Sequence, residues 1–199
     1  MRDTCESHAR CNVVEVMGRG AGDIAIHSAL ATGSTAVVVA EIPSDANKII
    51  EKIKNSRSLG KRNFIVVVSE SMGESFSPAL AEKIEADTGV ETRFARFAHV
   101  VRGGVPTLRD RFLASRMGER AVVELFNDNS NIVICERNGD IVVSNIDYAL
   151  TLDHMYKNKL KDGELNSFTE AEIAQMKAEC EEKQKLMKSL YTTIEHFGL

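Results

Sequence analysis

Short apolar runs alternate with amphipathic stretches through the first half of the chain. Four runs are rich in Val, Ile and Phe and have the length of buried strands, at residues 13–17, 36–40, 64–68 and 92–97. Helical periodicity between them predicts helices over residues 21–31, 45–56 and 78–86, the last with Ser77 as N-cap and Pro78 at its first position. This alternation predicts a parallel sheet flanked by helices.

The second half begins with one long helical pattern and a hairpin. Residues 107–127 are predicted to form a single helix whose broad apolar surface consists of Leu108, Phe112, Met117, Val122, Val123 and Phe126. The strand-like runs 131–135 and 141–144 flank Asn138-Gly139, a dipeptide typical of tight hairpin turns. We therefore expect a two-stranded ribbon there.

The last part of the chain is strongly charged. Ser167 and Glu170 have capping-box spacing, so we expect a helix to begin near Thr169. Its apolar positions follow three-and-four spacing, with an interruption at Lys183 and Gln184. They are Ile173, Met176, Cys180, Met187, Leu190, Ile194 and Phe197. A short coiled-coil seam fits this stripe, but we expect it to dock on the protein's own surface.

Composition narrows the class of protein. With 199 residues, 43% of them hydrophobic, the chain can bury one full core with an appended element. A formal net charge of −4 argues against a nucleic-acid partner, because such binding needs many cationic side chains. The four cysteines show no CxxC pairing, the opening segment does not resemble a signal peptide, and no apolar run is long enough to span a membrane. We expect a cytoplasmic protein without a membrane partner.

The first candidate for chemistry is a glycine-rich turn. It follows His8-Ala-Arg10 and lies in the segment VVEVMGRGAGD, residues 13–23, between a predicted strand and a predicted helix. Such turns present backbone N–H groups at a helix N-terminus, where an anion is favoured. Many α/β proteins use the same kind of turn only for tight packing, so both interpretations stay open.

The second candidate is an arginine-rich segment, residues 91–111, which leads from the fourth strand into the long helix. We expect Arg93, His99 and Arg102 to converge at the carboxyl edge of the sheet, where open α/β folds bind ligands. Guanidinium groups suit phosphate because they donate two parallel hydrogen bonds. Surface salt bridges are the alternative role for these arginines.

Together the two segments resemble the phosphofructokinase family, in which VVEVMGRxxGD precedes ETR, GHxQRGGxPxxxDRxxASRMG and a β-ribbon. The match runs from Arg2 to about Ile146 and is closest over residues 110–118. It implies an α/β fold: a three-layer parallel-sheet domain of the family's C-terminal type, then a long helix, a β-hairpin and a C-terminal helical extension. The implied divisions are a sugar-phosphate-binding domain (1–105), a helix and hairpin that pack on the family's N-terminal domain (106–146) and the extension (147–199).

The resemblance also implies a binding site for fructose 6-phosphate. Its matching contacts are Met17, Gly18, Arg19, Glu70, His99, Val100, Val101 and Arg102. Arg19 resembles the arginine that stabilises charge on the transferring phosphoryl group. Arg10 and Arg93 match arginines that reach a neighbouring subunit's 6-phosphate. Without the resemblance, Glu70 would be taken for a solvated loop glutamate.

An effector site is implied more weakly. Arg2 and Lys61 match two basic positions of the family's effector site, but Thr35 and Leu59 depart from its pattern. Effector control in the usual allosteric form is therefore in doubt.

Other departures lie close to the sugar-phosphate motif. Ala98 stands where the family usually has glycine, Val101 where it has glutamine, and Ala40 where it has proline. None of these departures removes an arginine expected to contact phosphate.

Two family motifs are missing from the sequence: the GGDG loop that holds the phosphoryl donor, and TIDND, whose aspartate is the catalytic base. We expect Mg²⁺ and ATP, or pyrophosphate, to bind to the missing N-terminal half, and this chain to bind no metal and to be inactive alone. The full enzyme is implied to be a homo-oligomer, a tetramer. Without the other half the apolar face of the long helix lacks its partner, and we expect the tail helix or a second copy to cover it.

Three hypotheses remain open from sequence. The first is the C-terminal portion of a glycolytic 6-phosphofructokinase, which transfers a phosphoryl group to the 1-hydroxyl of fructose 6-phosphate. The second is a non-catalytic sugar-phosphate-binding or regulatory module of the same descent. The third is an α/β interaction domain that uses the C-terminal helix.

Overall fold

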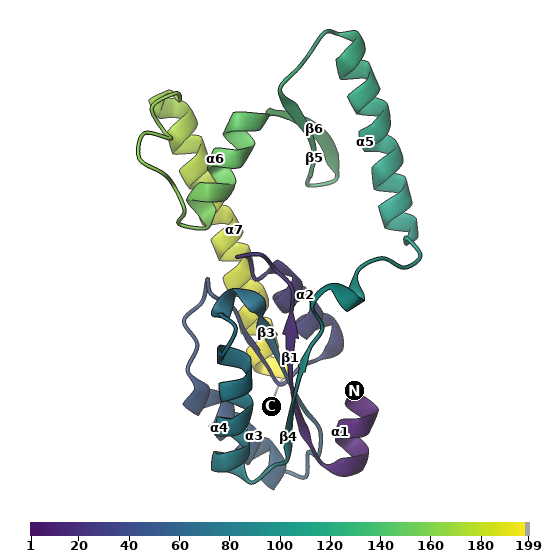
Figure 1. Ribbon diagram of the computed structural model, residues 1–199, viewed down its shortest axis with the longest axis vertical. Helices are drawn as coiled ribbons and strands as arrows, with labels where there is room; N and C mark the ends of the chain where they lie inside the picture. Colours follow the sequence, from purple (N-terminus) through teal and green to yellow (C-terminus); the bar gives the residue numbers. More distant parts are fainter. Residues whose placement is uncertain (198–199) are drawn as a thin grey trace. The chain divides into compact units, whose positions relative to one another are not determined.

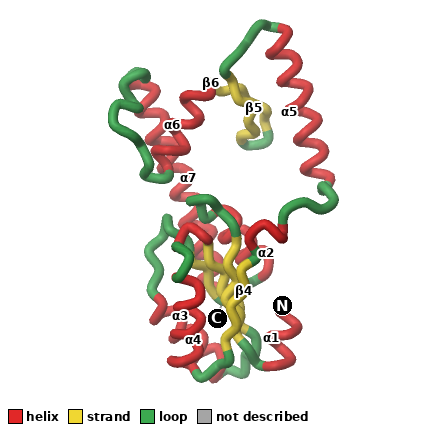
Figure 2. The backbone as a smooth tube through the Cα atoms, viewed as in Figure 1, coloured by secondary structure: helices red, strands yellow, loops and turns green. Residues whose placement is uncertain are grey.

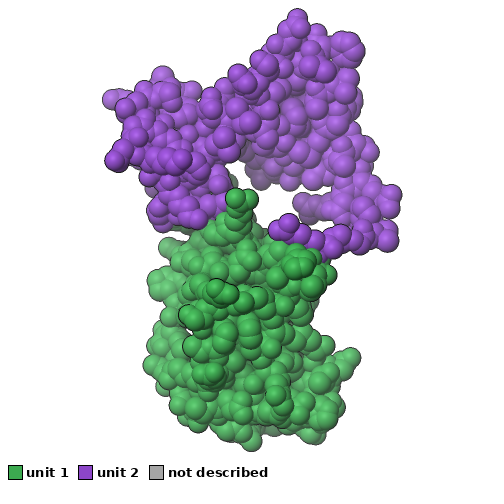
Figure 3. All heavy atoms as spheres, viewed as in Figure 1, with its two compact units in different colours: residues 1–101, 182–199 green, residues 102–181 purple. Residues whose placement is uncertain are grey.

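The computed structural model describes residues 1–197 and divides the chain into two compact units (Figure 3). The first unit comprises residues 1–101 and the chain from Glu182 onward, and the second comprises residues 102–181. These units do not follow the three expected segments one for one, because the end of the tail helix packs in the same core as the sheet. The expected division by role stays a prediction.

The first unit is built on a four-stranded parallel sheet (Figure 2). Its strands are β1 (Cys11–Val16), β2 (Ala36–Val38), β3 (Phe64–Ser69) and β4 (Thr92–Arg96), in the order β2-β3-β1-β4. Cys11 is paired with Phe64 on one side and with Thr92 on the other, so β1, β3 and β4 start level with one another. The predicted parallel sheet is confirmed.

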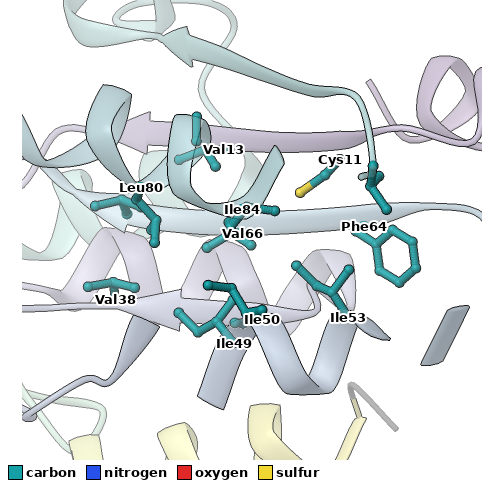
Figure 4. Packing of buried hydrophobic residues seen from close by; sticks show 14 residues of the cluster. Cys11, Val13, Val38, Ile49, Ile50, Ile53, Phe64, Val66, Leu80 and Ile84 are labelled. Atoms are coloured by element: carbon teal, nitrogen blue, oxygen red, sulfur yellow. The ribbon is translucent and has the colours of Figure 1, made fainter. Parts of the chain in front are cut away.

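Helices cover both faces of this sheet (Figure 1). On one face, α3 (Ala46–Ser58) and α4 (Phe76–Thr88) pack on Val13, Val66 and Val68 (Figure 4). On the other face, α1 (Arg2–His8) and α2 (Asp23–Thr32) pack on the intervening strand residues. Because successive strand residues face opposite sides and both sides are buried, the strands read as continuous apolar runs.

The start of α4 corrects one prediction. The helix begins at Phe76, with Ser75 as N-cap, so Pro78 is its third residue and Ser77 is buried inside the first turn. Proline is tolerated there because the first N–H groups of a helix have no intrahelical acceptor. Helix α1 was not predicted, since seven residues with one buried side chain, Cys5, give almost no periodic signal.

The second unit contains the predicted long helix and ribbon. Helix α5 (Leu108–Phe126) starts at a capping box formed by Thr107 and Asp110. Strands β5 (Ile132–Arg137) and β6 (Asp140–Asn145) pair antiparallel around Asn138 and Gly139, whose φ angles are 54° and 91°. Two positive φ angles suit the tight turn expected from this dipeptide. Helix α6 (Ile146–Tyr156) follows directly, and the start of α7 (Glu170–Phe197) completes the unit.

The tail helix α7 begins where it was expected, but with a different cap. Thr169 and Glu172 form the reciprocal hydrogen bonds of a capping box, so the predicted pair Ser167 and Glu170 is wrong. The expected docking is confirmed, because Met187 and Ile194 are each 1% exposed in the core to which α2 and the sheet also contribute. The side chain of Phe197, the last residue of the predicted stripe, lies outside the described part of the chain.

Helix α5 leaves most of its apolar face uncovered, although Met117 is half-buried. Leu108 is 84% exposed and Phe126 is 83% exposed. The expectation that the tail helix covers this face is wrong, because the apolar residues Met187 and Ile194 are used on the sheet. Cover by a second copy stays a prediction. None of the described helices is both long and apolar enough to cross a bilayer.

Candidate functional site

The glycine-rich turn and Glu70 meet at the carboxyl edge of the sheet. The turn follows β1, and Glu70 opens the short 3-10 helix η1 (Glu70–Met72) directly after the neighbouring strand β3. The backbone N–H groups of Gly18 and Arg19 donate to Oε1 of Glu70 at 3.0 and 2.7 Å. The structure thus brings together four predicted contacts: Met17, Gly18, Arg19 and Glu70.

Gly18 is required by this close approach. A Cβ atom at this position would lie 2.1 Å from the carbonyl oxygen of Ala21 and 3.1 Å from Oγ of Ser69. The next residue, Arg19, has a φ of 35°, which non-glycine residues seldom adopt. The turn therefore holds the exposed Arg19 side chain on a tightly constrained backbone.

A second carboxylate closes the other end of the turn. The N–H of Gly22 donates to Oε1 of Glu41 at 2.6 Å, and Oε2 of Glu41 is buried with no hydrogen-bond partner among the described residues. Three turn amides are therefore bonded to the chain's own carboxylates instead of facing a bound anion. This arrangement favours a shape-keeping role for the glycines and leaves phosphate recognition to side chains.

The short helix η2 (Ala98–Val101) lies beyond the end of β4, at the same edge. Its residues His99, Val100 and Val101 are exposed. Ala98 has a φ of 41°, in the left-handed region that glycine adopts more readily. His99 thus follows the strand next to β1, on the edge that carries Arg19 and Glu70, while Arg102 belongs to the second unit.

The opposite edge carries Arg10 and Arg93. Arg10 precedes β1 and Arg93 is the second residue of β4, opposite Asn12. Nε of Arg10 donates to Glu91 Oε2 at 2.6 Å, and Arg93 donates to the other oxygen of Glu91. The pKa of Glu91 is held below its usual value, mainly by the hydrogen bond from Arg10 and to a smaller extent by that from Arg93.

The expected convergence of Arg93 with His99 is wrong within one chain. Three strand residues, about 10 Å of extended backbone, lead from Arg93 to the end of β4. Parallel strands present their starts and ends at opposite edges, so the two side chains cannot share one pocket of this unit. A role of Arg10 and Arg93 at a neighbouring subunit's site stays a prediction.

The predicted effector residues lie in the first unit. Arg2 donates to the carbonyl oxygens of Thr32 and Gly33, at the carboxyl end of α2. The pKa of Lys61 is lowered by burial first, and then by the positive charges of Lys52 and Arg2. The role of Arg2 and Lys61 toward an effector stays a prediction.

Known proteins resemble this chain over most of its length. The family model described as phosphofructokinase matches residues 1–125. The chain belongs to the phosphofructokinase family. It is 41% identical over 160 residues to ATP-dependent 6-phosphofructokinase 1 of Clostridium perfringens, a match that covers 80% of this chain and 50% of that protein. The chain spans about half the length of the curated relatives it matches.

Solved phosphofructokinases share the fold. The structure of phosphofructokinase from Saccharomyces cerevisiae aligns with a TM-score of 0.73 at 28% identity, covering 78% of this chain and 22% of that one. Pyrophosphate-dependent phosphofructokinase from Nitrosospira multiformis aligns with a TM-score of 0.59 at 23% identity, covering 72% of this chain and 41% of its own, which supports the fold alone. The predicted α/β fold of the family is confirmed.

Three acidic residues with structural contacts in this unit were not predicted. Glu41 caps the turn at Gly22, Glu91 joins two arginines, and Glu15 is buried inside β1. Glu15 and Glu41 had a signal in the sequence, since a carboxylate inside or shortly after an apolar strand needs a partner, whereas Glu91 precedes its strand and had none. In the described part of the chain, no group of three or more His, Cys, Asp or Glu side chains is placed to hold a metal ion.

Proposed function

We propose that this chain supplies the acceptor half of a 6-phosphofructokinase, which transfers a phosphoryl group to the 1-hydroxyl of fructose 6-phosphate in glycolysis. The observation that supports it is the gathering of Met17, Gly18, Arg19 and Glu70 at one sheet edge, with His99 after the adjacent strand. These residues come from three separate strand ends of a chain in the phosphofructokinase family. Strand ends at this edge are the usual ligand-binding place of α/β folds.

Each side chain has a defined part in this proposal. Arg19 offers a fixed positive charge to the phosphoryl oxygens, where charge is spread in the transition state. Glu70 accepts hydrogen bonds from sugar hydroxyls, and His99 and Arg102 donate to the sugar phosphate. Arg10 and Arg93 contact the 6-phosphate bound to a neighbouring copy, which requires a homo-oligomer. We place this enzyme in the cytoplasm. We keep Val100 and Val101 as further contacts.

The phosphoryl donor belongs to the other half of the enzyme in this proposal. The GGDG and TIDND motifs are not part of this sequence, and we propose that Mg²⁺ binds with the donor in that other half. ATP is favoured over pyrophosphate as the donor because the curated relatives at about 40% identity are named ATP-dependent. The chain alone is then expected to bind the acceptor without turnover.

Calorimetry with fructose 6-phosphate tests the acceptor site. We expect saturable binding to the wild-type chain, no binding of unphosphorylated fructose, and binding weakened about tenfold by Arg19→Gln, which removes a charge-assisted contact. Lys54→Gln is the matched control, because Lys54 is an exposed cation on α3, outside the site. Absence of heat with the folded wild-type chain would contradict the proposal.

Turnover separates the enzyme from a non-catalytic module. Adding a polypeptide that carries the donor motifs is expected to restore phosphoryl transfer, and persistent binding without turnover would favour the regulatory module. The third hypothesis, an interaction domain that uses the tail stripe, is disfavoured by the burial of Met187 and Ile194 in the chain's own core. Those side chains are not available to a partner.

A further inference from the structure

Glu15 is an unusual residue for a buried strand. It lies in the inner strand β1 with its side chain 6% exposed, opposite the apolar Val68 of β3 on one side and Arg96 of β4 on the other. Burying a carboxylate is costly unless it is paired and hydrogen-bonded. Its Oε2 has no hydrogen-bond partner among the described residues, so the desolvation cost of this oxygen is not offset. The pairing of the other oxygen is therefore structurally important.

The partner of Glu15 is Arg96, the last residue of the neighbouring strand. Nε of Arg96 donates to Oε1 of Glu15 at 2.6 Å. Nη2 of the same guanidinium donates to the backbone carbonyl of Glu74 at 2.7 Å. Because a guanidinium is planar and its donors are fixed, these two bonds set the distance between β1 and the Glu74 segment.

The bonds of Arg96 connect all three parts of the acceptor site in this unit. Glu15 lies two residues before Met17, and Arg96 lies three residues before His99. Glu74 follows η1, whose first residue is Glu70. The side chain of Glu74 is 92% exposed, so its segment is not fixed by burial of that side chain. The guanidinium of Arg96 provides a fixed point there.

We propose that Glu15 and Arg96 are positioning residues that hold the turn at Gly18 and Arg19, the Glu70 segment and the His99 segment in one arrangement. The pair acts through other residues and touches no substrate. This inference rests on the proposed function for its consequence in sugar binding. Its structural consequence is that the hydrogen bonds from the two turn amides to Glu70 are kept, and this can be measured without any sugar.

Two variants separate positioning from stability. Arg96→Met leaves Glu15 as a buried unpaired charge and is expected to destabilise the fold. The double variant Glu15→Gln with Arg96→Met removes that charge and is expected to recover stability. It does not recover the hydrogen bond to the backbone carbonyl of Glu74. Arg57→Met is the matched control, because Arg57 also donates from its guanidinium to a backbone carbonyl in this unit, that of Thr88 at 2.9 Å.

Amide hydrogen exchange measured by NMR gives the first result. In the double variant we expect the amides of Gly18 and Arg19 to exchange about tenfold faster, as expected for the loss of a charge-assisted hydrogen bond. The amides of Val66 and Val67 in β3 serve as the internal reference and are expected not to change. Unchanged exchange at Gly18 and Arg19 would overturn the inference, as would equal acceleration at all four amides.

Binding of fructose 6-phosphate gives the second result. We expect the double variant to bind about tenfold more weakly, which corresponds to about 1.4 kcal/mol, and Arg57→Met to bind as the wild type does. If the double variant shows faster exchange and unchanged affinity, the pair does not position the sugar site and the inference fails. If the wild-type chain binds no sugar while exchange responds as expected, the proposed function fails and the structural hold stands.

Discussion

At the carboxyl edge of the sheet, two non-glycine residues adopt left-handed backbone conformations beside the predicted sugar-phosphate contacts. They are Arg19, with a φ of 35°, and Ala98, with a φ of 41°. Such conformations cost on the order of 1 kcal/mol or more and are kept where the surroundings fix them. Here the bonds from Gly18 and Arg19 to Glu70 hold the first of them. Arg19 is itself expected to contact the sugar phosphate, and Ala98 directly precedes His99, another expected contact.

Gly18 gives a prediction about stability at this edge. In Gly18→Ala the new methyl group would meet the Ala21 carbonyl oxygen, a backbone atom that can move only if the turn rearranges. We expect a loss of about 2 kcal/mol or more in the free energy of unfolding, measured by urea denaturation. The bonds from the turn to Glu70 would weaken at the same time.

The control for this substitution is Gly118→Ala in α5, where an added Cβ meets nothing within 4 Å. Alanine is the better helix former, so this variant is expected to gain about 0.5–1 kcal/mol. A neutral Gly18→Ala variant would show that the turn is looser than the structure indicates.

Among the elements, the four strands were predicted within about two residues, because both sheet faces are buried and give uninterrupted apolar runs. Helix starts were less certain. Near α4 and α7 several Ser, Thr and Glu residues compete as caps, and the choice depends on packing of the first turn, as at the buried Ser77. The site motifs were found from the sequence. The predicted strand 92–97 already placed Arg93 near its start, so the strand direction alone argued against its convergence with His99, and the register confirms its position.

The docking of α7 gives a prediction at this scale. Met187→Ala would leave a cavity in the core that α7 shares with Val14 and Val67, since Met187 is 1% exposed. We expect a loss of about 2–5 kcal/mol in urea denaturation. The adjacent residue Leu186 is 57% exposed, so Leu186→Ala on the same helix is expected to change stability by no more than about 0.5 kcal/mol. Equal effects of the two variants would contradict the docked arrangement.

For the molecule as a whole, the main physical problem is the uncovered apolar stripe of α5. Leu108 and Phe126 are 18 residues apart, about five helical turns, so they lie on the same side of the helix. Phe112, at 60% exposure, and Val122, at 51%, fall close to the same line. Ser115 and Glu119 fall on this side between them, so the exposed apolar surface consists of two patches at the ends of a line about 27 Å long, and exposed patches of this kind are typical of an interaction surface. The sequence predicted the stripe but not its cover, because periodicity shows that a face is apolar and not what packs against it.

Self-association tests whether a second copy covers this stripe. We expect sedimentation velocity to show concentration-dependent association of the wild-type chain, and the double variant Leu108→Gln with Phe126→Gln to be shifted toward the monomer. Both side chains are more than four-fifths exposed, so the substitutions should cost the fold little. Leu59→Gln is the matched control, because Leu59 is equally exposed but lies at the end of α3. An exposed apolar surface of this size should favour association. A wild-type chain that stays monomeric at every concentration and binds no hydrophobic dye would therefore contradict cover by a second copy.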